Sequence, residues 1–397
     1  IGMGAFQSSG ITSIEIPDSV TSIGSYAFDG TSSLTNVTLG NGITTIGYGT
    51  FRGSGITSIE IPDSVMSIEN YAFSTSTLKR IDIPTKLEGG ISGAPWGAYS
   101  AIIYWKDVVD IKPFVFNTTT KTVVKYIGTE TNVEVPSEFT VGGQVYGVEH
   151  IGENAFKDNK TITSIEIPDS VTSIGNYAFS GTSSLKNVTL GNGITTIGTY
   201  AFWDSGITSI EIPDSVMSIG TSAFYGTRSL RNVTLGKGVT TIGGSAFANS
   251  GIISIEIPDS VTSIGESAFY RTRSLRNVTL GNGITTIENS VFSESGITSI
   301  EIPDSVTSIV SYAFNKTRSL TNVTLGKGVT TIGSNAFYNS GITSIEIPDS
   351  VTSIGESAFY GTSYLTNVTL GKGVTTIGTY AFYNSGITSI EIPDSVT

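Results

Sequence analysis

The histidine at position 150 is the only one in the chain, and a Ser-His-acid triad or a histidine metal cluster would have to use it. Serines and acidic residues recur along the whole sequence, so a Ser or Glu close to His150 is no evidence for a triad. Cysteine is absent, which excludes a thiolate nucleophile, a thiolate metal site and disulfide bonds. We therefore expect a structural or surface role for His150, and no catalytic, cofactor-binding or metal-binding residue.

Three other chemistries have partial sequence signals. Gly236-Lys237-Gly238 lacks the downstream Lys-Ser/Thr of a phosphate-binding loop. Paired glycosidase carboxylates need a unique pocket, and near-identical repeats do not offer one. The glycosylation sequon Asn-Val-Thr recurs at Asn36, Asn187, Asn232, Asn277, Asn322 and Asn367. We interpret it as a strand consensus, because a glycan on every second repeat would crowd the surface. The sequence thus predicts a protein that is not an enzyme.

One octapeptide, SIEIPDSV, sets the organisation of the chain. It begins at Ser13, Ser58, Ser164, Ser209, Ser254, Ser299, Ser344 and Ser389, at intervals of 45 residues with a single interval of 106. Each 45-residue period contains two similar halves, such as 10–31 and 32–54. The repeating unit is therefore a coil of 22 or 23 residues, and a fixed period of this length is typical of solenoid proteins.

Each coil combines a strand, a turn and a return to the interior. Residues 14–16 (Ile-Glu-Ile) and 37–39 (Val-Thr-Leu) alternate with period two, which predicts strands with one buried face. Residues 17–19 and 40–42 are turn formers at equivalent places. Burying about six apolar side chains per coil yields ~10–15 kcal/mol, whereas ordering the coil costs ~20–40 kcal/mol. A coil is too short to fold alone, so stacking on its neighbours is obligatory.

The consensus L-x-x-I-x-I-P-x-x-V-x-x-I-G-x-x-A-F resembles the leucine-rich repeat of the BspA-like surface-protein family over nearly all of the chain outside 89–130. The resemblance implies a mainly β, right-handed leucine-rich-repeat solenoid of 22/23-residue coils in a 45-residue double repeat, with an irregular central cap or insert. Family members often carry Cys shortly after Ala-Phe, where this chain has Thr31, Ser54, Thr182 and Ser205. We expect a slightly altered corner there and an unchanged fold.

The middle of the chain departs from the repeat. Residues 89–105 resemble the segment that terminates some arrays in this family. Residues 122–126 and 132–136 alternate like strands, and 140–145 read as a hairpin around a Gly-Gly turn.

We therefore prefer two domains. A first array with its terminating segment spans 1–105, a boundary lies at 106–116, and a second array with its own N-terminal cap spans 117–397. The alternative is one array with a long side loop. Both chain ends read as cut within a repeat, which suggests a fragment of something longer.

Net charge is −12 with an isoelectric point near 4.6, so we expect the surface to repel nucleic acid and anionic membranes. The longest run of large apolar residues, 101–105, is too short to span a bilayer. The family resemblance implies an extracellular or cell-surface location. We expect a monomer that binds neither nucleic acid nor the membrane interior.

The doubled period also separates like charges. Coils stack at about 4.8 Å, so alternating a Glu15-type strand with a Thr38-type strand spaces the carboxylates by ~10 Å, beyond the ~8 Å screening length at physiological salt. At the turn edge, Asp214, Lys237 and Asp259 should lie on successive coils with opposite signs. Each such exposed ion pair is worth under ~1 kcal/mol.

The outward strand positions and the coil edge form the candidate binding face: Glu166, Glu211, Glu256, Glu301, Glu346, Arg231, Arg276, Tyr225, Tyr270, Tyr360 and Trp203. Tyr26, Tyr177 and Tyr312 precede Ala-Phe, whereas Tyr225, Tyr270 and Tyr360 follow it, as if either position covers one spot. Trp203 and Tyr338 would extend the row. These aromatics are either a packing lid between coils or a row that stacks on a sugar or grips a partner.

Taken together, these features favour adhesion or partner binding without turnover. The family resemblance implies attachment to host proteins or to neighbouring cells. One alternative is a carbohydrate-binding surface that uses the aromatic row, and glycans are then the partners. A second alternative is a passive stalk that displays another domain, which the near-identity of the repeats supports. No cofactor is expected.

Overall fold

The computed structural model describes residues 1–84, 95–98, 101–105 and 107–397. Residues 89–94 and 99–100 of the predicted terminating segment, and boundary residue Lys106, lie outside the described residues. The chain forms two compact units, residues 1–110 with 117–119, and residues 111–116 with 120–397. Each is described by itself below. The proposed boundary at 106–116 stays a prediction.

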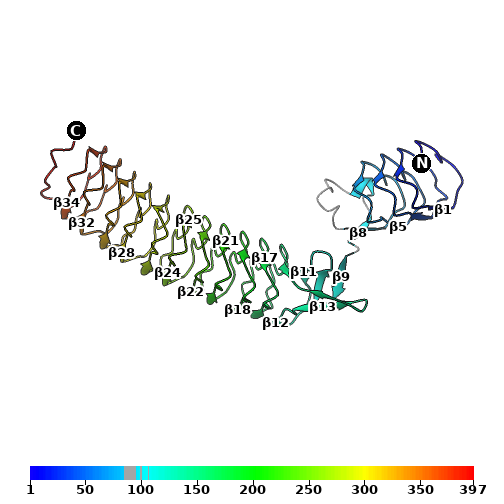
Figure 1. Ribbon diagram of the computed structural model, residues 1–397, viewed down its shortest axis with the longest axis horizontal. Helices are drawn as coiled ribbons and strands as arrows, with labels where there is room; N and C mark the ends of the chain where they lie inside the picture. The colour runs from blue at the N-terminus through cyan, green and yellow to red at the C-terminus, as the bar shows by residue number, and fades with distance from the viewer. Residues whose placement is uncertain (85–94, 99–100, 106) are drawn as a thin grey trace. The chain divides into compact units, whose positions relative to one another are not determined.

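Both units are right-handed solenoids in which the regular coils each contribute one longer and one two-residue strand. The alternation of apolar and polar residues forms the longer strand, and the turn residues that follow end it. In the second unit the longer strands lie along one side and the two-residue strands along the other (Figure 1). We call the first side the long-strand face.

In its described residues the first unit contains five longer strands, three two-residue strands and a short helix. Its longer strands are β1 (Ser13–Ile16), β3 (Asn36–Leu39), β5 (Ser58–Glu60), β7 (Arg80–Ile83) and β8 (Ile102–Trp105), and its two-residue strands are β2 (Ser22–Ile23), β4 (Thr45–Ile46) and β6 (Ser67–Ile68). The 3₁₀ helix η2 spans Pro95–Gly97.

The second unit begins with strands that do not follow the repeat. These are β10 (Phe114–Asn117), β11 (Thr122–Tyr126), β12 (Asn132–Glu134) and the antiparallel hairpin of β13 (Glu138–Val141) and β14 (Gln144–Gly147); β9 (Val108–Ile111) lies where the two units divide. The predicted strands at 122–126 and 132–136 and the predicted hairpin are thus confirmed. Gly142 and Gly143 have positive φ angles of 58° and 84°, the conformation that the tight turn requires.

The regular coils follow. Their longer strands are β16 (Ser164–Glu166), β18 (Asn187–Thr189), β20 (Ser209–Glu211), β22 (Asn232–Thr234), β24 (Ser254–Glu256), β26 (Asn277–Thr279), β28 (Ser299–Glu301), β30 (Asn322–Thr324), β32 (Ser344–Glu346) and β34 (Asn367–Thr369). Their two-residue strands are β15 (His150–Ile151), β17 (Ser173–Ile174), β19 (Thr196–Ile197), β21 (Ser218–Ile219), β23 (Thr241–Ile242), β25 (Ser263–Ile264), β27 (Thr286–Ile287), β29 (Ser308–Ile309), β31 (Thr331–Ile332), β33 (Ser353–Ile354) and β35 (Thr376–Ile377).

Strand pairing is parallel and its register shows the doubled period. Glu256 pairs with Thr279, and Glu301 pairs with Thr324, so the predicted alternation of the two strand types is confirmed. Pairing across a 23-residue step involves all three strand residues, whereas β22 and β24, one 22-residue step apart, pair only through Asn232 and Ser254. The double repeat is therefore visible in the backbone ladder as well as in the side chains.

The core is a continuous apolar column shared by successive coils. The isoleucines that flank each strand glutamate point inward and are almost completely buried, as Ile255 and Ile257 are. Behind them the phenylalanines form a stack with ring centroids 4.9–5.7 Å apart between neighbouring coils. Each ring is thus covered by rings from the coils above and below, which is the mutual burial that single coils lack.

Larger aromatic residues cover the ends of this stack where the repeat stops. In the first unit Trp96 lies edge-on to Phe73, with ring centroids 6.3 Å apart. In the second unit Tyr126 stacks on Phe156 at 5.3 Å, and Phe114 packs on Tyr126 at 5.5 Å. The hairpin residue Phe139 packs in turn on Phe114. These contacts bury Phe73 and Phe156, the stacked rings next to the interruption of the repeat.

At the turn edge, the aspartates accept hydrogen bonds from the backbone instead of forming the expected ion pairs with lysines. The backbone N–H of Lys237 donates to Asp214 Oδ1 at 2.7 Å, and the N–H of Asn192 donates in the same way to Asp169 Oδ1 at 2.7 Å. No ammonium–carboxylate pair forms between these successive coils in the described part of the chain. Because the carboxylate satisfies a turn N–H, either Lys or Asn fits the next coil, and the expected pairing of side-chain charges is wrong.

The corner after Ala-Phe also alternates between coil types. In first-type coils the Thr hydroxyl donates to the Phe carbonyl three residues earlier, as Thr227 does to Phe224 at 2.7 Å. In second-type coils a buried Ser occupies this position, and the hydroxyls of Ser54, Ser205, Ser250, Ser295 and Ser340 have no hydrogen-bond partner among the described residues. Five of the second-type coils thus hold an unsatisfied hydroxyl at a corner where the fold is kept.

Candidate functional site

The predicted glutamates form a column on the long-strand face. Glu166, Glu211, Glu256, Glu301 and Glu346 each end a strand and are exposed. Each of them is paired with a Thr on the next longer strand of the array. Beside this column runs a second polar column in which Ser and Asn alternate. The face therefore presents carboxylate, hydroxyl and amide groups in fixed rows.

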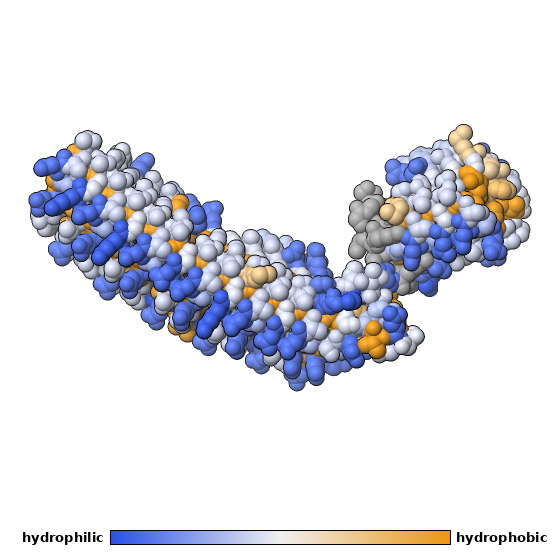
Figure 2. All heavy atoms as spheres, viewed as in Figure 1, coloured by the Kyte–Doolittle hydropathy of each residue, from blue (hydrophilic) through white to orange (hydrophobic). Residues whose placement is uncertain are grey.

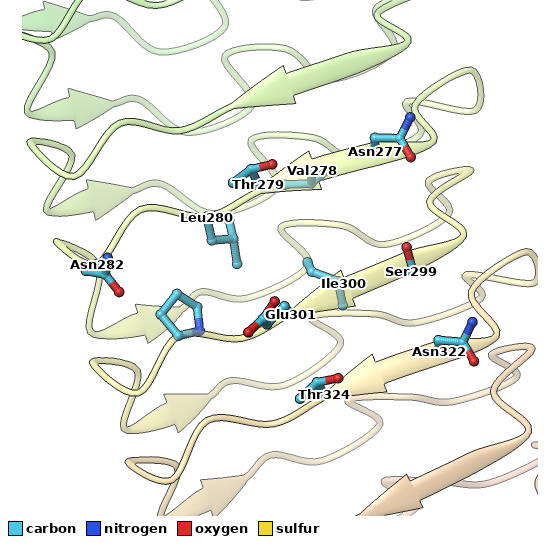
Figure 3. A pocket seen from close by; sticks show the side chains of 11 residues that line it. Asn277, Val278, Thr279, Leu280, Asn282, Ser299, Ile300, Glu301, Asn322 and Thr324 are labelled. Atoms are coloured by element: carbon cyan, nitrogen blue, oxygen red, sulfur yellow. The ribbon is translucent and has the colours of Figure 1, made fainter.

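Hollows recur along this face. One of about 590 Å³ lies around Glu301, which is flanked by Thr279 and Thr324 of the adjacent strands, with Asn277 and Asn322 at the other end of these strands (Figure 3). The next along the array, about 820 Å³, contains Glu346 and is lined by equivalent residues. The lining repeats because the sequence repeats. A partner is therefore offered similar subsites at Glu301 and Glu346, which differ at the turn in carrying Asn282 or Lys327.

Arg231 and Arg276, predicted as part of the binding face, are exposed but also hold neighbouring coils together. Nη1 of Arg231 donates to the carbonyls of Arg228 at 2.6 Å and of Gly251, on the next coil, at 3.1 Å. Arg276 makes the same two contacts, to Arg273 at 2.7 Å and to Gly296 at 3.1 Å. Part of each guanidinium is thus committed to backbone carbonyls, and these two arginines are less available to a partner than the glutamates.

The aromatic residues occupy two neighbouring columns, so the expectation that either position covers one spot is wrong. Where a coil carries both, the rings touch edge to face, as in Tyr200 with Trp203 at 6.1 Å and Tyr380 with Tyr383 at 5.6 Å. Positions two before and one after Phe therefore lie side by side.

The predicted aromatic row is continuous over only part of the array. Tyr338, Tyr360 and Tyr383 stack with ring centroids 5.0 Å apart at both steps. Tyr225 and Tyr270 are separated by Ala248 at the equivalent position of the intervening coil. Tyr225, Tyr270 and Tyr360 are half-buried and Trp203 is 37% exposed. All four rings pack against the coil and keep one part accessible to a ligand.

The side-chain hydrogen bonds of His150 within the described residues are to hydroxyls. Its Nδ1 lies 2.8 Å from Ser173 Oγ and 3.4 Å from Thr172 Oγ1. The adjacent carboxylate, Glu149, forms an ion pair with Lys121. No hydrogen bond joins His150 to an acid among the described residues. Within the described ranges, no group of three or more His, Asp or Glu residues could hold a metal ion.

Sequence reasoning missed a group of cations at the corner between the phenylalanine stack and the long-strand face. Arg228, Arg271, Arg273, Lys316 and Arg318 are all exposed there. Together with Arg231 and Arg276 we call them the arginine edge. The signal was present in the sequence as Thr-Arg-Ser-Leu, which occurs three times at a 45-residue interval.

On the face of the second unit that Figure 2 shows, hydrophilic residues recur in rows along the array, and hydrophobic residues show mainly in the gaps between them. Contacts on that face are therefore polar. None of the described helices is long and apolar enough to cross a membrane.

Comparison with known proteins places these features in a family. Residues 1–94 and overlapping segments that together cover 149–397 match the sequence profile described as the BspA type leucine rich repeat region, in six copies. No curated protein matches the chain. A leucine-rich repeat protein from Bacteroides ovatus is similar in structure, with 23% identity, a TM-score of 0.51, and coverage of 73% of this chain and 87% of that one.

Two further solved structures match with lower TM-scores. A leucine rich cell surface protein from Faecalibacterium prausnitzii is 27% identical with a TM-score of 0.38, covering 72% of this chain and 94% of that one. The pneumococcal vaccine antigen PcpA is 24% identical with a TM-score of 0.47, covering 71% and 87%. From the profile match over most of its length, the chain belongs to the BspA-type leucine-rich repeat family.

Proposed function

We propose that this chain is a non-enzymatic adhesion protein of the cell surface or extracellular space that binds partner proteins through its long-strand face. The observation that carries the proposal is the exposed glutamate column, repeated on every second coil beside hollows of like lining. These side chains do not build the core. Their regular arrangement is therefore free to serve recognition, and leucine-rich repeat solenoids are typically binding scaffolds.

The proposed partner is a surface protein of a host or neighbouring cell with cationic groups facing the glutamates. Each exposed charge contact is worth under about 1 kcal/mol, so specificity and strength come from several subsites engaged at once. The chain acts as a monomer in this proposal, because one copy already carries five equivalent glutamates.

A carbohydrate-binding surface is the second candidate, and the stack of Tyr338, Tyr360 and Tyr383 favours it. Accessible aromatic rings in a line are suited to stacking on sugar rings. A passive stalk is the third candidate, and the similarity of the hollows favours it, because similar subsites define no unique patch.

The test measures saturable binding of the fluorescently labelled chain to intact cells of candidate hosts or neighbours. The first variant, Glu256→Thr/Glu301→Thr/Glu346→Thr, installs the residue that the alternate strands carry at this position. The control, Asp259→Asn/Asp304→Asn/Asp349→Asn, removes the same charge at the turn edge and keeps an oxygen acceptor for the backbone N–H.

We expect the Glu triple to weaken binding about tenfold or more, since three contacts of under ~1 kcal/mol are lost, and the Asp triple to have little effect. If the partner is a protein, protease treatment of the cells should abolish binding. If the partner is a carbohydrate, glycosidase treatment should abolish it instead. Equal binding by the native chain and both triples would refute the role of the long-strand face. Absence of any saturable binding would favour the stalk.

A further inference from the structure

The arginine edge concentrates positive charge on a chain whose net charge is −12. Five successive coils contribute the segments between Phe and the next long strand, namely residues 225–231, 248–253, 270–276, 293–298 and 315–321. These segments hold seven Arg or Lys residues and one acid, Glu294. The local charge of this edge is therefore positive, although the chain as a whole is acidic.

Three exposed arginines stand in a regular row. Arg228, Arg273 and Arg318 occupy equivalent positions on alternate coils, which places them about 10 Å apart along the array. Two hollows lie between them. One of about 330 Å³ is lined by Arg228, Arg271 and Arg273, and one of about 520 Å³ by Arg273, Lys316 and Arg318 together with the acid Glu294. Arg273 belongs to both hollows, so they form consecutive sites along one line.

The backbone and small residues of the intervening coils line the same hollows. Ser250 and Gly251 line the first, and Ser295 and Gly296 line the second. These coils carry Gly where the arginine-bearing coils have a Ser of the Thr-Arg-Ser-Leu segment, and a Cβ at Gly251 or Gly296 would lie 2.2 Å from the carbonyl oxygen of Arg228 or Arg273, so the backbones approach closely there. The space for an anionic group is the two hollows between the exposed side chains of Arg228, Arg273 and Arg318.

The single acid does not neutralise the edge. Glu294 lies 3.0 Å from Arg271 and 3.8 Å from Arg273. The hydrogen bond from Arg271, helped by the charges of Lys316 and Arg273, holds the pKa of Glu294 below its usual range. Arg228 and Arg318 form no ion pair within the described part of the chain. The guanidinium of Arg271 also lies over the Tyr270 ring, 4.9 Å from its centroid.

We propose that the arginine edge binds a linear sulfated polysaccharide. Guanidinium groups bind sulfate oxygens through paired, charge-assisted hydrogen bonds, and a row with a fixed step suits a polymer with sulfates at regular intervals. A thin chain fits this row, because the glutamate column repels a broad polyanion such as a nucleic acid duplex that would overlap the long-strand face. The edge shares no lining residue with the hollows around Glu301 and Glu346, so this inference is independent of the proposed protein partner.

The experiment uses the full chain and immobilised heparin as the probe. The test variant is Arg228→Ser/Arg273→Ser/Arg318→Ser, in which each Arg is replaced by the residue found at the equivalent positions Ser32, Ser183 and Ser363. The matched control is Lys237→Asn/Lys327→Asn/Lys372→Asn. It removes the same charge at the turn edge, using the residue found at the equivalent Asn41, Asn192 and Asn282. Both variants therefore use residues that the repeat already accommodates.

We expect the native chain to bind heparin with an affinity that falls as salt rises. The Arg triple should bind about tenfold more weakly or worse, from the loss of three exposed charge contacts, and its affinity should depend less steeply on salt. The Lys triple should bind within about twofold of the native chain. Circular dichroism spectra and melting temperatures of the three proteins check that the fold is kept.

Three results would overturn the proposal. The first is absence of heparin binding by the native chain at physiological salt. The second is an equal loss in the two triples, which would make net charge the cause. The third is equal or tighter binding of duplex DNA or polyglutamate in competition with heparin, which would assign the edge to another polyanion. Desulfated heparin should compete poorly, and effective competition by it would contradict the role of sulfate.

Discussion

Phe269→Ala tests whether the phenylalanine stack holds the array together. Phe269 is 0% exposed, and its ring centroid lies 5.6 Å from that of Phe247 and 5.4 Å from that of Phe292. Removing the ring forfeits ~2–3 kcal/mol of burial and about 0.5–1 kcal/mol for each of two ring contacts. We therefore expect the free energy of unfolding to fall by about 3–5 kcal/mol, as other Phe-to-Ala core changes do.

Urea unfolding followed by circular dichroism measures this loss. The matched control is Glu256→Lys. Glu256 lies on the exposed strand face of the same coil, so its carboxylate is replaced without opening a cavity. We expect its cost to stay within about 0.5 kcal/mol. Equal costs for the two changes, or a cost under about 1 kcal/mol for Phe269→Ala, would refute the view that stacked rings stabilise the coils while the strand glutamates are free for recognition.

Three further changes probe the corners and edges of the coils. Ser250→Ala should raise the urea midpoint by an amount equivalent to about 0.5–1 kcal/mol, because Ser250 is 4% exposed and its hydroxyl has no partner in the described chain; a fall in midpoint would show that the hydroxyl is satisfied. Asp29→Asn should destabilise the first unit at pH 7 but not at low pH. Two hydrogen bonds of 2.8 Å from Arg52 hold the pKa of Asp29 below its usual range, so its stabilisation is present above the unfolded pKa near 3.9 and is lost as pH falls through the lowered folded value; a melting-temperature difference that persists to pH 2 would contradict this. Gly238→Ala should cost about 1–3 kcal/mol in urea unfolding, since a Cβ there would lie 1.9 Å from the Asp214 carbonyl oxygen; an unchanged midpoint would mean that the turn shifts freely.

Much of the fold could be predicted because the same residue pattern returns at a fixed spacing. The Ile-Glu-Ile alternation fixes which face of the strand is buried, and the 22/23-residue spacing fixes which residues meet on the next coil. The hairpin at 138–147 followed from a Gly-Gly pair between alternating residues. The position of the glutamate column on an exposed face follows from the same period-two rule.

The hydrogen-bond partners of long side chains could not be predicted from the repeat. Arg231 and Lys237 both lie at exposed positions, yet one guanidinium bonds to carbonyls of the next coil, while the other residue contributes only its backbone N–H to Asp214. Spacing fixes where a side chain starts but not which of several acceptors it reaches. The contact between Phe114 and Phe139 could not be predicted either, because it joins segments that follow no repeat.

Carboxyl footprinting tests the central claim of this account most directly, namely that partners are recognised by the long-strand face. The chain is labelled with a carbodiimide and an amine, free and when bound to the cells that it recognises, and the labelled residues are identified by mass spectrometry. We predict protection of Glu166, Glu211, Glu256, Glu301 and Glu346, with Asp214, Asp259 and Asp304 at the turn edge labelled as before. Protection of the turn-edge aspartates with continued labelling of the glutamate column would contradict the account.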